Sequence, residues 1–274
     1  MSNYLFILQP PSPALVPFFY TCNMFPKILL LALCIQLSIY SNAQAPFTSP
    51  YKLSLAVDIP LGTNAIGLLG TSYLLGTTHL LPSQESIIKL DRKSINKFDR
   101  GATYQNSKTC GYISDATMYA AIALPLMHLI NPNSRKDFGK IAVMTAEVFA
   151  LNIAVTNLFK ETIHRARPLV YNPNVPLSKK LKKDNFKSFF SGHTSTVSSM
   201  SFFFAATYAT YNPNSKLKPM VWSLCAALPI LTGVLRYKAG KHYWTDVITG
   251  YLVGAAIGVA VPYLHSVKWK FNQK

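Results

Sequence analysis

Residues 235–264 read LRYKAGKHYWTDVITGYLVGAAIGVAVPYL. The later part of this stretch carries a single charge, on Asp246, and is about as long as the roughly 20 residues with which a helix crosses a bilayer. Glycine recurs at every fourth position, at Gly250, Gly254 and Gly258, so small residues share one face of the predicted helix. The stretch therefore predicts a membrane-spanning helix that packs closely against a neighbour and follows a basic, polar segment.

Further apolar segments of similar length precede this one. Charged residues make up 14% of the chain, well below the roughly 25% of soluble domains, and mean hydropathy is positive at +0.20. These values predict an all-α, membrane-embedded bundle of about five to six helices. Glu147 stands out because an ionisable residue within a membrane segment is a functional candidate by default. The segments lie at residues 59–81, 112–130, 141–159, 193–211 and 219–235.

The N-terminal region has the layout of an export signal. From Met24 the chain reads MFPKILLLALCIQLSIYSNAQA, in which the positive Lys27 precedes an apolar stretch and a pair of small residues, Ala43 and Ala45. We expect cleavage after Ala45; an uncleaved anchor helix is the alternative. Residues 1–23 fit no part of a signal, which favours Met24 as the true start.

The net charge of +17 would suit nucleic acid, an anionic lipid surface or a phosphorylated substrate. The basic residues lie mainly between the apolar segments, with no nucleic-acid-binding signature and no zinc-ligand spacing. We therefore expect a membrane and a phosphorylated substrate as partners, and no nucleic acid. Two of the loops between the apolar segments, 82–111 and 160–192, are long and basic.

The first polar motif, KETIHRARP, runs from Lys160 to Pro168 after the segment 141–159. A helix that continued through Lys160 and Arg167 would place both on one face, because two helical turns take about 7.2 residues. An ammonium and a planar guanidinium that converge on one point make a phosphate clamp. Taken alone, however, basic residues at the end of a membrane helix are more often interfacial anchors.

The second motif, SFFSGHTS, spans residues 188–195 and precedes the segment 193–211. Ser191, Gly192 and His193 are predicted at a helix N-terminus, where unpaired backbone N–H groups bind an oxyanion and glycine allows its close approach. His193 can then donate a proton to a leaving oxygen. Ser191 also suits a helix cap, a role compatible with anion binding.

The third motif, LRYKAGKHYWTD, runs from Leu235 to Asp246 and joins the last two apolar segments. His242 and Asp246 are four residues apart, so on a helix the carboxylate lies beneath the imidazole. There it can keep one ring nitrogen protonated and leave the other free to attack phosphorus. The chain order puts all three motifs on one membrane face, which predicts a single anion site that also includes Arg236.

These residues resemble the three-part signature of the type 2 phosphatidic acid phosphatase and vanadium haloperoxidase superfamily, K-x6-RP, PSGH and SR-x5-H-x3-D. The resemblance covers about residues 112–264, and it is closest to bacterial membrane lipid phosphatases. Phe190 stands where proline is usual and Leu235 where serine is usual. Neither departure removes a group that does chemistry, although the second loses a hydroxyl contact to phosphate.

The resemblance implies a helical bundle in which His242 is the nucleophile, Asp246 orients it and His193 protonates the leaving group. It implies no metal ion and no cofactor, because cationic side chains hold the phosphate. The phosphate-binding residues it implies are Lys160, Arg167, Ser191, Gly192 and Arg236. The predicted organisation is a presequence at 1–45, a helix and basic loop at 46–111, and a phosphatase domain at 112–274.

The predicted function is hydrolysis of a phosphate monoester or pyrophosphate on a membrane lipid through a phosphohistidine. Phosphatidate, phosphatidylglycerophosphate, undecaprenyl pyrophosphate and lipid A phosphates all fit, and no oligomeric state is indicated. A vanadate-dependent haloperoxidase and a non-catalytic lipid-phosphate binder or transporter are the alternatives.

The predicted location is a bacterial inner membrane. Basic residues in the short loops around Arg135 and Lys216 match the positive-inside rule and place the motifs on the periplasmic face. A cleaved N-terminus outside the membrane followed by three full spans would instead put them in the cytoplasm. Both expectations hold if residues 59–81 lie along or dip into the membrane without crossing it.

Overall fold

The computed structural model describes residues 48–78 and 82–267. The chain divides into two units, Met1–Pro46 and Phe47–Lys274. The first unit lies outside the described residues, and so does the predicted export signal. Within the described residues the secondary structure is helical apart from one β-bridge between Tyr51 and Ser266. The predicted all-α fold is thus confirmed for this part of the chain.

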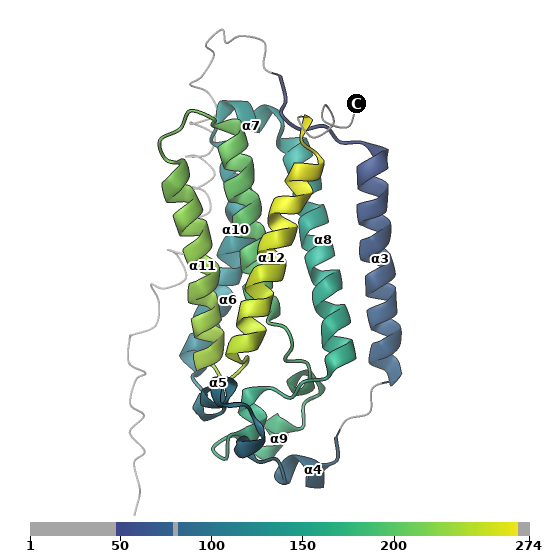
Figure 1. Cartoon of the computed structure of the whole chain (residues 1–274), viewed down its shortest axis with the longest axis vertical. Helices are drawn as coiled ribbons and strands as arrows, with labels where there is room; N and C mark the ends of the chain where they lie inside the picture. The colour runs from purple at the N-terminus through teal and green to yellow at the C-terminus, as the bar shows by residue number, and fades with distance from the viewer. Residues whose placement is uncertain (1–47, 79–81, 268–274) are drawn as a thin grey trace, which may run out of the picture. The chain divides into compact units, whose positions relative to one another are not determined.

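Each apolar segment predicted from the sequence forms a long helix (Figure 1). Within the described residues, three stretches are long and apolar enough to cross a membrane, namely Phe138–Tyr171, Lys218–Lys238 and Trp244–Leu264. The long helices are α3 (Leu55–Thr78), α6 (Lys108–Ala123), α8 (Phe138–Ile163), α10 (Gly192–Tyr211), α11 (Lys218–Lys238) and α12 (Trp244–Leu264).

α10 is the central helix and packs against α6, α8, α11 and α12. Its contact with α12 is the closest, because the glycine face predicted from the sequence lies directly on the backbone of α10. A Cβ built at Gly250, Gly254 or Gly258 would lie 2.6, 2.3 or 2.3 Å from the backbone oxygens of Ser191, Ser195 and Ser199, respectively. Side chains larger than hydrogen at these positions would push the two helices apart.

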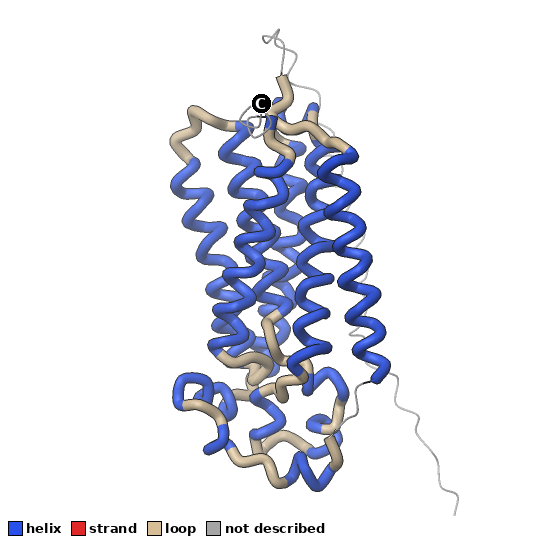
Figure 2. Tube along the Cα trace, turned by 45° about the vertical axis from the view of Figure 1, so that its right-hand side comes forward, coloured by secondary structure: helices blue, strands red, loops and turns tan. Residues whose placement is uncertain are grey.

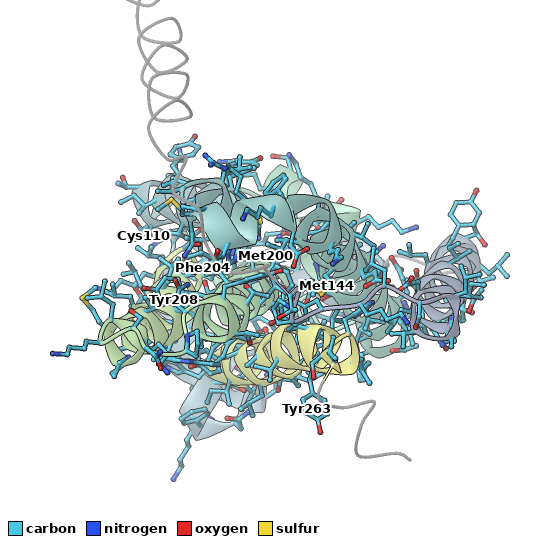
Figure 3. The ribbon with its side chains drawn as sticks, turned by 90° about the horizontal axis from the view of Figure 1, so that it is seen from above. Cys110, Met144, Met200, Phe204, Tyr208 and Tyr263 are labelled. Carbon is cyan, nitrogen blue, oxygen red and sulfur yellow. The ribbon has the colours of Figure 1, made fainter. Side chains whose placement is uncertain are left out.

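The apolar core lies between α8 and α10. Met144, Val148, Met200 and Phe203 are fully buried in it. Figure 3 shows Met144 and Met200 inside the bundle, whereas Tyr263 points away from it and is 58% exposed. Large apolar side chains also cover the outer surface, as expected for helices in contact with lipid; they include Ile66, Leu74, Leu224, Leu231 and Leu252.

The loops gather the three motifs at one end of the bundle. α8 and α11 end there, and α10 and α12 begin there, while the long loops fold beneath them as short helices (Figures 1 and 2). These are α4 (Gln84–Ile88), η1 (Arg92–Ser94), α5 (Lys97–Arg100), η2 (Gly101–Tyr104), η4 (Pro168–Tyr171), α9 (Leu177–Lys180) and η5 (Lys183–Phe186). The opposite end carries η3 (Leu124–Leu129) and α7 (Pro132–Lys136).

Two local expectations differ from the structure. α8 ends at Ile163, and His164 adopts a left-handed conformation with φ of 50°, so Arg167 lies beyond the helix that carries Lys160. α3 packs along α8 and lies beside it in both views, which does not fit residues 59–81 lying along the membrane surface. α3 is not among the three stretches found long and apolar enough to cross a membrane, so the other half of that expectation, a segment that dips into the membrane without crossing it, stays a prediction. α3 and α8 both begin at the end of the bundle opposite the motifs.

The close contact between α10 and α12 makes Gly254 sensitive to added volume. We expect Gly254→Ala to destabilise the protein by about 1–3 kcal/mol, because the new methyl group overlaps the Ser195 carbonyl. Gly67→Ala in α3 is the matched control, since nothing lies within 4 Å of a Cβ there. Thermal unfolding in detergent measures both; equal effects at the two positions would contradict the packing argument.

Candidate active site

The second and third motifs are joined at the start of α10. Ser191 caps this helix, and its hydroxyl accepts a hydrogen bond from the backbone N–H of Thr194 at 3.4 Å. The backbone N–H of Ser191 donates to the carbonyl of Asp246 at 3.0 Å. The predicted anion-binding helix N-terminus is therefore fixed to the first turn of α12.

Lys160 reaches this helix N-terminus from the last turn of α8. A Cβ built on Gly192 would lie 3.2 Å from Nζ of Lys160 and 3.3 Å from a methyl group of Thr156. The absence of a side chain at Gly192 thus leaves room for the lysine ammonium beside the unpaired N–H groups of α10. Both features favour an anion at this point.

Arg167 enters the site from the loop after α8. The loop is anchored to the third motif, because the N–H of Leu169 donates to the carbonyl of Gly240 at 2.9 Å. Gly240 has a φ of 66° and could not carry a side chain, since a Cβ would lie 2.3 Å from the Gln105 carbonyl oxygen. Arg167 is 5% exposed and pairs at 2.7 Å with Asp184, whose side chain is 68% exposed.

Arg236 is the third cationic side chain predicted to bind phosphate, and it comes from the last turn of α11. It is 5% exposed, and its Nη1 lies 3.3 Å from the Ser114 hydroxyl and 3.5 Å from Asp115. The Nε atoms of Arg167 and Arg236 are both buried and have no hydrogen-bond partner among the described residues. Two buried guanidinium groups with unused donors are suited to binding an anion such as phosphate.

His242 follows α11 and is 1% exposed. Its Nδ1 lies 2.9 Å from the backbone carbonyl of Ser188 and 3.5 Å from Oδ2 of Asp246. Because a carbonyl oxygen only accepts, Nδ1 carries the proton of the neutral ring and Nε2 keeps its lone pair. The sequence predicted this division between the two nitrogens, but assigned the acceptor to Asp246 rather than to the backbone of the second motif.

The environment of His242 favours its neutral form. Burial lowers the pKa of this imidazole well below its usual value, and the positive charges of Arg236, Arg167 and Lys160 lower it further. These three charges come from the first and third motifs. A neutral Nε2 retains the lone pair that a nucleophile needs, including at pH values where an exposed histidine is protonated.

Asp246 is fully buried and holds a polar network together. Its Oδ1 accepts from Arg165 at 2.5 Å, and its Oδ2 accepts from the Ser188 hydroxyl at 2.6 Å and the Tyr243 N–H at 3.0 Å. Arg165 also donates to Asp99 at 2.8 Å. Asp246 therefore fixes Ser188, whose carbonyl in turn accepts the hydrogen bond from Nδ1 of His242.

Arg165, Asp99 and Ser188 were not predicted as site residues from the sequence. Arg165 and Ser188 lie within the first and second motifs, but nothing in their spacing separates them from their neighbours. Asp99 lies in the loop 82–111, and no pattern relates it to α12. In the structure burial raises the pKa of Asp99, but hydrogen bonds from Asn96, Arg165 and Thr245 outweigh it, so the pKa lies below its usual value.

His193 begins the first turn of α10, and its Nε2 lies 2.7 Å from Oδ1 of Asp115 in α6. Asp115 was not predicted as a site residue, although it is ionisable and lies within the apolar segment 112–130. The signal that pointed to Glu147, an ionisable residue within an apolar segment, applies equally to Asp115. Asp115 is therefore a common neighbour of His193 and Arg236.

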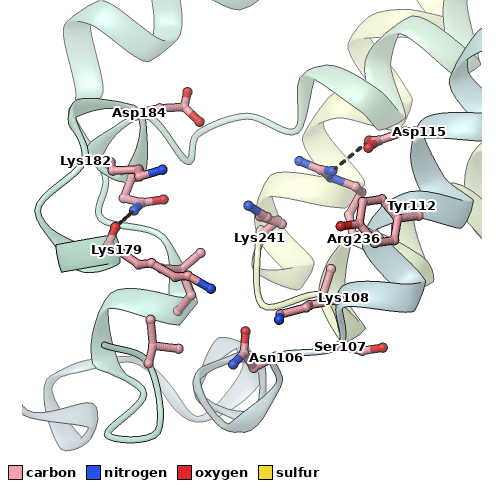
Figure 4. A pocket seen from close by; sticks show the side chains of 15 residues that line it. Asn106, Ser107, Lys108, Tyr112, Asp115, Lys179, Lys182, Asp184, Arg236 and Lys241 are labelled. Atoms are coloured by element: carbon pink, nitrogen blue, oxygen red, sulfur yellow. Dashed lines mark hydrogen bonds and ion pairs between the residues drawn. The ribbon is translucent and has the colours of Figure 1, made fainter. Parts of the chain in front are cut away.

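A cavity of about 450 Å³ opens beside Arg236 and Asp115 (Figure 4). Burial lowers the pKa of the Lys241 ammonium, and the charges of Arg167 and Arg236 act in the same direction. Lysines from α6, from α9 and the residues after it, and from the loop before α12 point into or along the cavity. They are Lys108, Lys179, Lys182 and Lys241.

Comparisons with known proteins give a family and individual proteins to which the chain is similar. Residues 141–270 match the model of the PAP2 superfamily, and the match includes every predicted site residue. A relative from Arabidopsis thaliana, named "Probable lipid phosphate phosphatase 4", is 30% identical over 105 residues, which make up 35% of this chain and 32% of the relative. The chain thus spans about a third of the length of this curated relative.

Among solved structures, a transmembrane PAP2-type phosphatidylglycerolphosphate phosphatase from Bacillus subtilis is similar. It is 19% identical, the TM-score is 0.46, and the match covers 76% of this chain and 95% of that one.

The fold is a helical bundle with helices long and apolar enough to cross a membrane, and at one end of it two histidines lie near buried cationic side chains. Residues 141–270 match the PAP2 superfamily, and the resemblance inferred from the three motifs is confirmed over this range.

Proposed function

We propose that the protein is a metal-independent phosphatase that hydrolyses a phosphate monoester or pyrophosphate on a membrane lipid through a phosphohistidine. The observation that carries this proposal is the surroundings of His242. Its Nδ1 is engaged by the Ser188 carbonyl, which leaves Nε2 as the reactive atom. Two buried arginines with unused N–H donors act on the same ring.

In the first step, Nε2 of His242 attacks phosphorus and the bond from phosphorus to the leaving oxygen breaks. His193 gives its proton to that oxygen, so the product leaves as an alcohol or a protonated phosphate. In the second step, His193 accepts a proton from water, the resulting hydroxide attacks phosphorus, and the bond from phosphorus to Nε2 breaks. Inorganic phosphate leaves, and both histidines return to their initial states.

The cationic side chains stabilise the charge that develops on phosphate during both steps. Lys160, Arg167 and Arg236 come from different motifs, and the N–H groups at the start of α10 add a further positive region. Asp246 acts as a positioning residue, because it holds Ser188 and thereby the acceptor of the His242 proton. Asp115 is placed to orient the ring of His193.

The lipid character of the substrate rests on the location of the site. The motifs lie at the ends of apolar helices, where a lipid phosphate would meet them. The cavity beside Arg236 is lined by Lys108, Lys179, Lys182 and Lys241, which favours an anionic headgroup. Specificity among the candidate lipids depends on this cavity and on the outer helix surfaces.

We further propose an inner-membrane location with the site facing outward, on the strength of the short basic loops at the opposite end. α3 begins at that opposite end, so if α3 crosses the membrane, an outward-facing site places Leu55 on the inner side. Cleavage after Ala45 by a peptidase outside the membrane would instead place Leu55 on the outer side. Under that condition the two sequence predictions exclude each other, and we retain the outward-facing site.

Replacement of His242 tests the proposed nucleophile. We expect His242→Ala to lower phosphate release by roughly four orders of magnitude or more and to abolish acid-labile labelling of the protein by ³²P-phosphatidate. His193→Ala should lose about 10²–10⁴-fold with phosphatidate but much less with p-nitrophenyl phosphate, whose leaving group needs no proton.

The His193→Ala variant is also the control for folding and labelling, since it keeps His242 and should still form the phosphohistidine. A labelled His242→Ala protein would contradict the assignment. Phosphatidate binding without phosphate release by the wild type would favour a binder over an enzyme.

The lysines of the cavity should affect substrate capture more than chemistry. We expect the double variant Lys179→Gln, Lys182→Gln to raise KM for phosphatidate in mixed micelles by about tenfold at low salt, with little change in kcat. The increase should shrink at 1 M salt because of screening. Lys93→Gln, at an exposed position of the other basic loop, 82–111, is the control; an equal effect there would rule out a specific role for the cavity.

Sidedness is measured with single cysteines in a cysteine-free background. Lys93 is exposed at the end that carries the motifs, and Lys136 is exposed at the opposite end. We expect a membrane-impermeant maleimide to label Lys93→Cys but not Lys136→Cys when it is applied from the outer side of the inner membrane. The reverse pattern would place the site in the cytoplasm.

A further inference from the structure

A second cluster of ionisable side chains lies at the end of the bundle opposite the candidate active site. Asp58 comes from the first turn of α3, Glu147 from the first half of α8, and His265 from the residue that caps the end of α12. The side chain of His265 is fully buried, that of Glu147 is 11% exposed and that of Asp58 is 24% exposed. The proposed phosphatase mechanism uses none of them.

The hydrogen bonds of His265 show which atoms of the cluster lack a donor. Its Nδ1 lies 2.8 Å from the Val261 carbonyl, so Nδ1 carries the proton of the neutral ring. Its Nε2 then directs a lone pair toward two carboxylate oxygens, Oδ1 of Asp58 at 2.8 Å and Oε2 of Glu147 at 3.4 Å. Three electron-rich atoms thus converge.

A second proton on the ring would not satisfy this cluster. An N–H at Nε2 could donate to Asp58, which is the nearer oxygen. Oε2 of Glu147 would remain buried without a hydrogen bond, as it is among the described residues. A buried carboxylate oxygen without a partner is costly, and a cation between the three atoms removes that cost.

The spacing and charge of the three atoms suit a metal ion. Bonds of about 2.0–2.2 Å to imidazole nitrogen and carboxylate oxygen place neighbouring ligand atoms roughly 3.4 Å apart in a tetrahedral site and about 3.0 Å apart in an octahedral one. The distances of 2.8 and 3.4 Å from Nε2 are close to these values, and the three ligand atoms all lie within 4.8 Å of one another. Two carboxylates and a neutral imidazole carry a charge that one divalent cation balances.

We propose that Asp58, Glu147 and His265 bind a divalent transition-metal ion of the Zn²⁺ or Mn²⁺ type. The imidazole nitrogen favours these ions over Mg²⁺ and Ca²⁺, which prefer all-oxygen sites. The ion is structural, since it lies at the end of the bundle opposite the histidines of the candidate active site.

The role of such an ion is to attach α3. Within this helix only Ala65 and Ser72 are buried, and its main neighbour is α8. The segment before α3 is already held to the end of α12, because Lys52 donates to the His265 carbonyl at 2.9 Å and Val267 donates to the Pro50 carbonyl at 3.0 Å. A metal ion at Asp58 would join the first turn of α3 to both α8 and α12.

The experiment uses the full chain, purified in detergent, stripped with a chelator and dialysed against Zn²⁺ or Mn²⁺. We expect one equivalent of metal per chain by elemental analysis and a higher midpoint of thermal unfolding than in the stripped protein. Glu147→Gln keeps the size of the side chain and removes its charge, so it should reduce bound metal to near zero and abolish the rise. Asp58→Asn should do the same.

The His242→Ala variant is the matched control, because it removes a histidine from the candidate active site and should retain one equivalent of metal. Wild-type protein that binds no metal and shows no thermal shift would overturn the proposal. Unchanged metal content in both Glu147→Gln and Asp58→Asn would also overturn it. Failure of the proposed phosphatase activity leaves these measurements unaffected, so the two proposals are separable.

Discussion

The contact between α10 and α12 is the constraint on which the candidate site depends. Three glycines of α12 lie against three serine carbonyls of α10, at distances that exclude a side chain. This contact sets the separation of the helix that begins with the second motif from the helix that begins with the third. The hydrogen bond from Ser191 to the Asp246 carbonyl continues the same contact to the site end. The glycines of α12 therefore contribute to the candidate site indirectly, because they set the positions of the side chains at the starts of α10 and α12.

The charges of the site are arranged so that each buried cation lies close to an acceptor or an anion-binding region. Arg165 pairs with Asp99 and Asp246, Arg167 pairs with Asp184, and Arg236 lies near Asp115. Arg165 is also stacked on the ring of Tyr243, with its guanidinium carbon 4.0 Å from the ring centre. The arginines with unused donors are those that the motifs assign to phosphate. Arg165, which donates to both Asp99 and Asp246, has a structural role, and this distinguishes it from Arg167 in the same loop.

Much of this arrangement could be predicted from the sequence because its signals are local. Apolar length predicted the helices, the four-residue spacing predicted the glycine face, and the chain order predicted that the three motifs lie at one end of the bundle. Contacts between distant segments could not be predicted in this way. Asp99 and Asp115 reach the site from a loop and from α6, and no periodicity links either residue to its partner. The end of α8 at Ile163 was also missed, since the left-handed turn at His164 has no glycine to mark it.

The acceptor for the His242 proton is a main-chain atom, the carbonyl oxygen of Ser188. Every amino acid supplies the same carbonyl, so no single substitution at position 188 can delete it. A substitution at position 188 therefore leaves the tautomer of the His242 ring unchanged. The Ser188 hydroxyl and the Asp246 carboxylate, which hold the segment in place, can by contrast be removed by substitution. Sequence drift in this protein can thus alter how firmly the ring is held without changing which of its nitrogens faces the phosphate site.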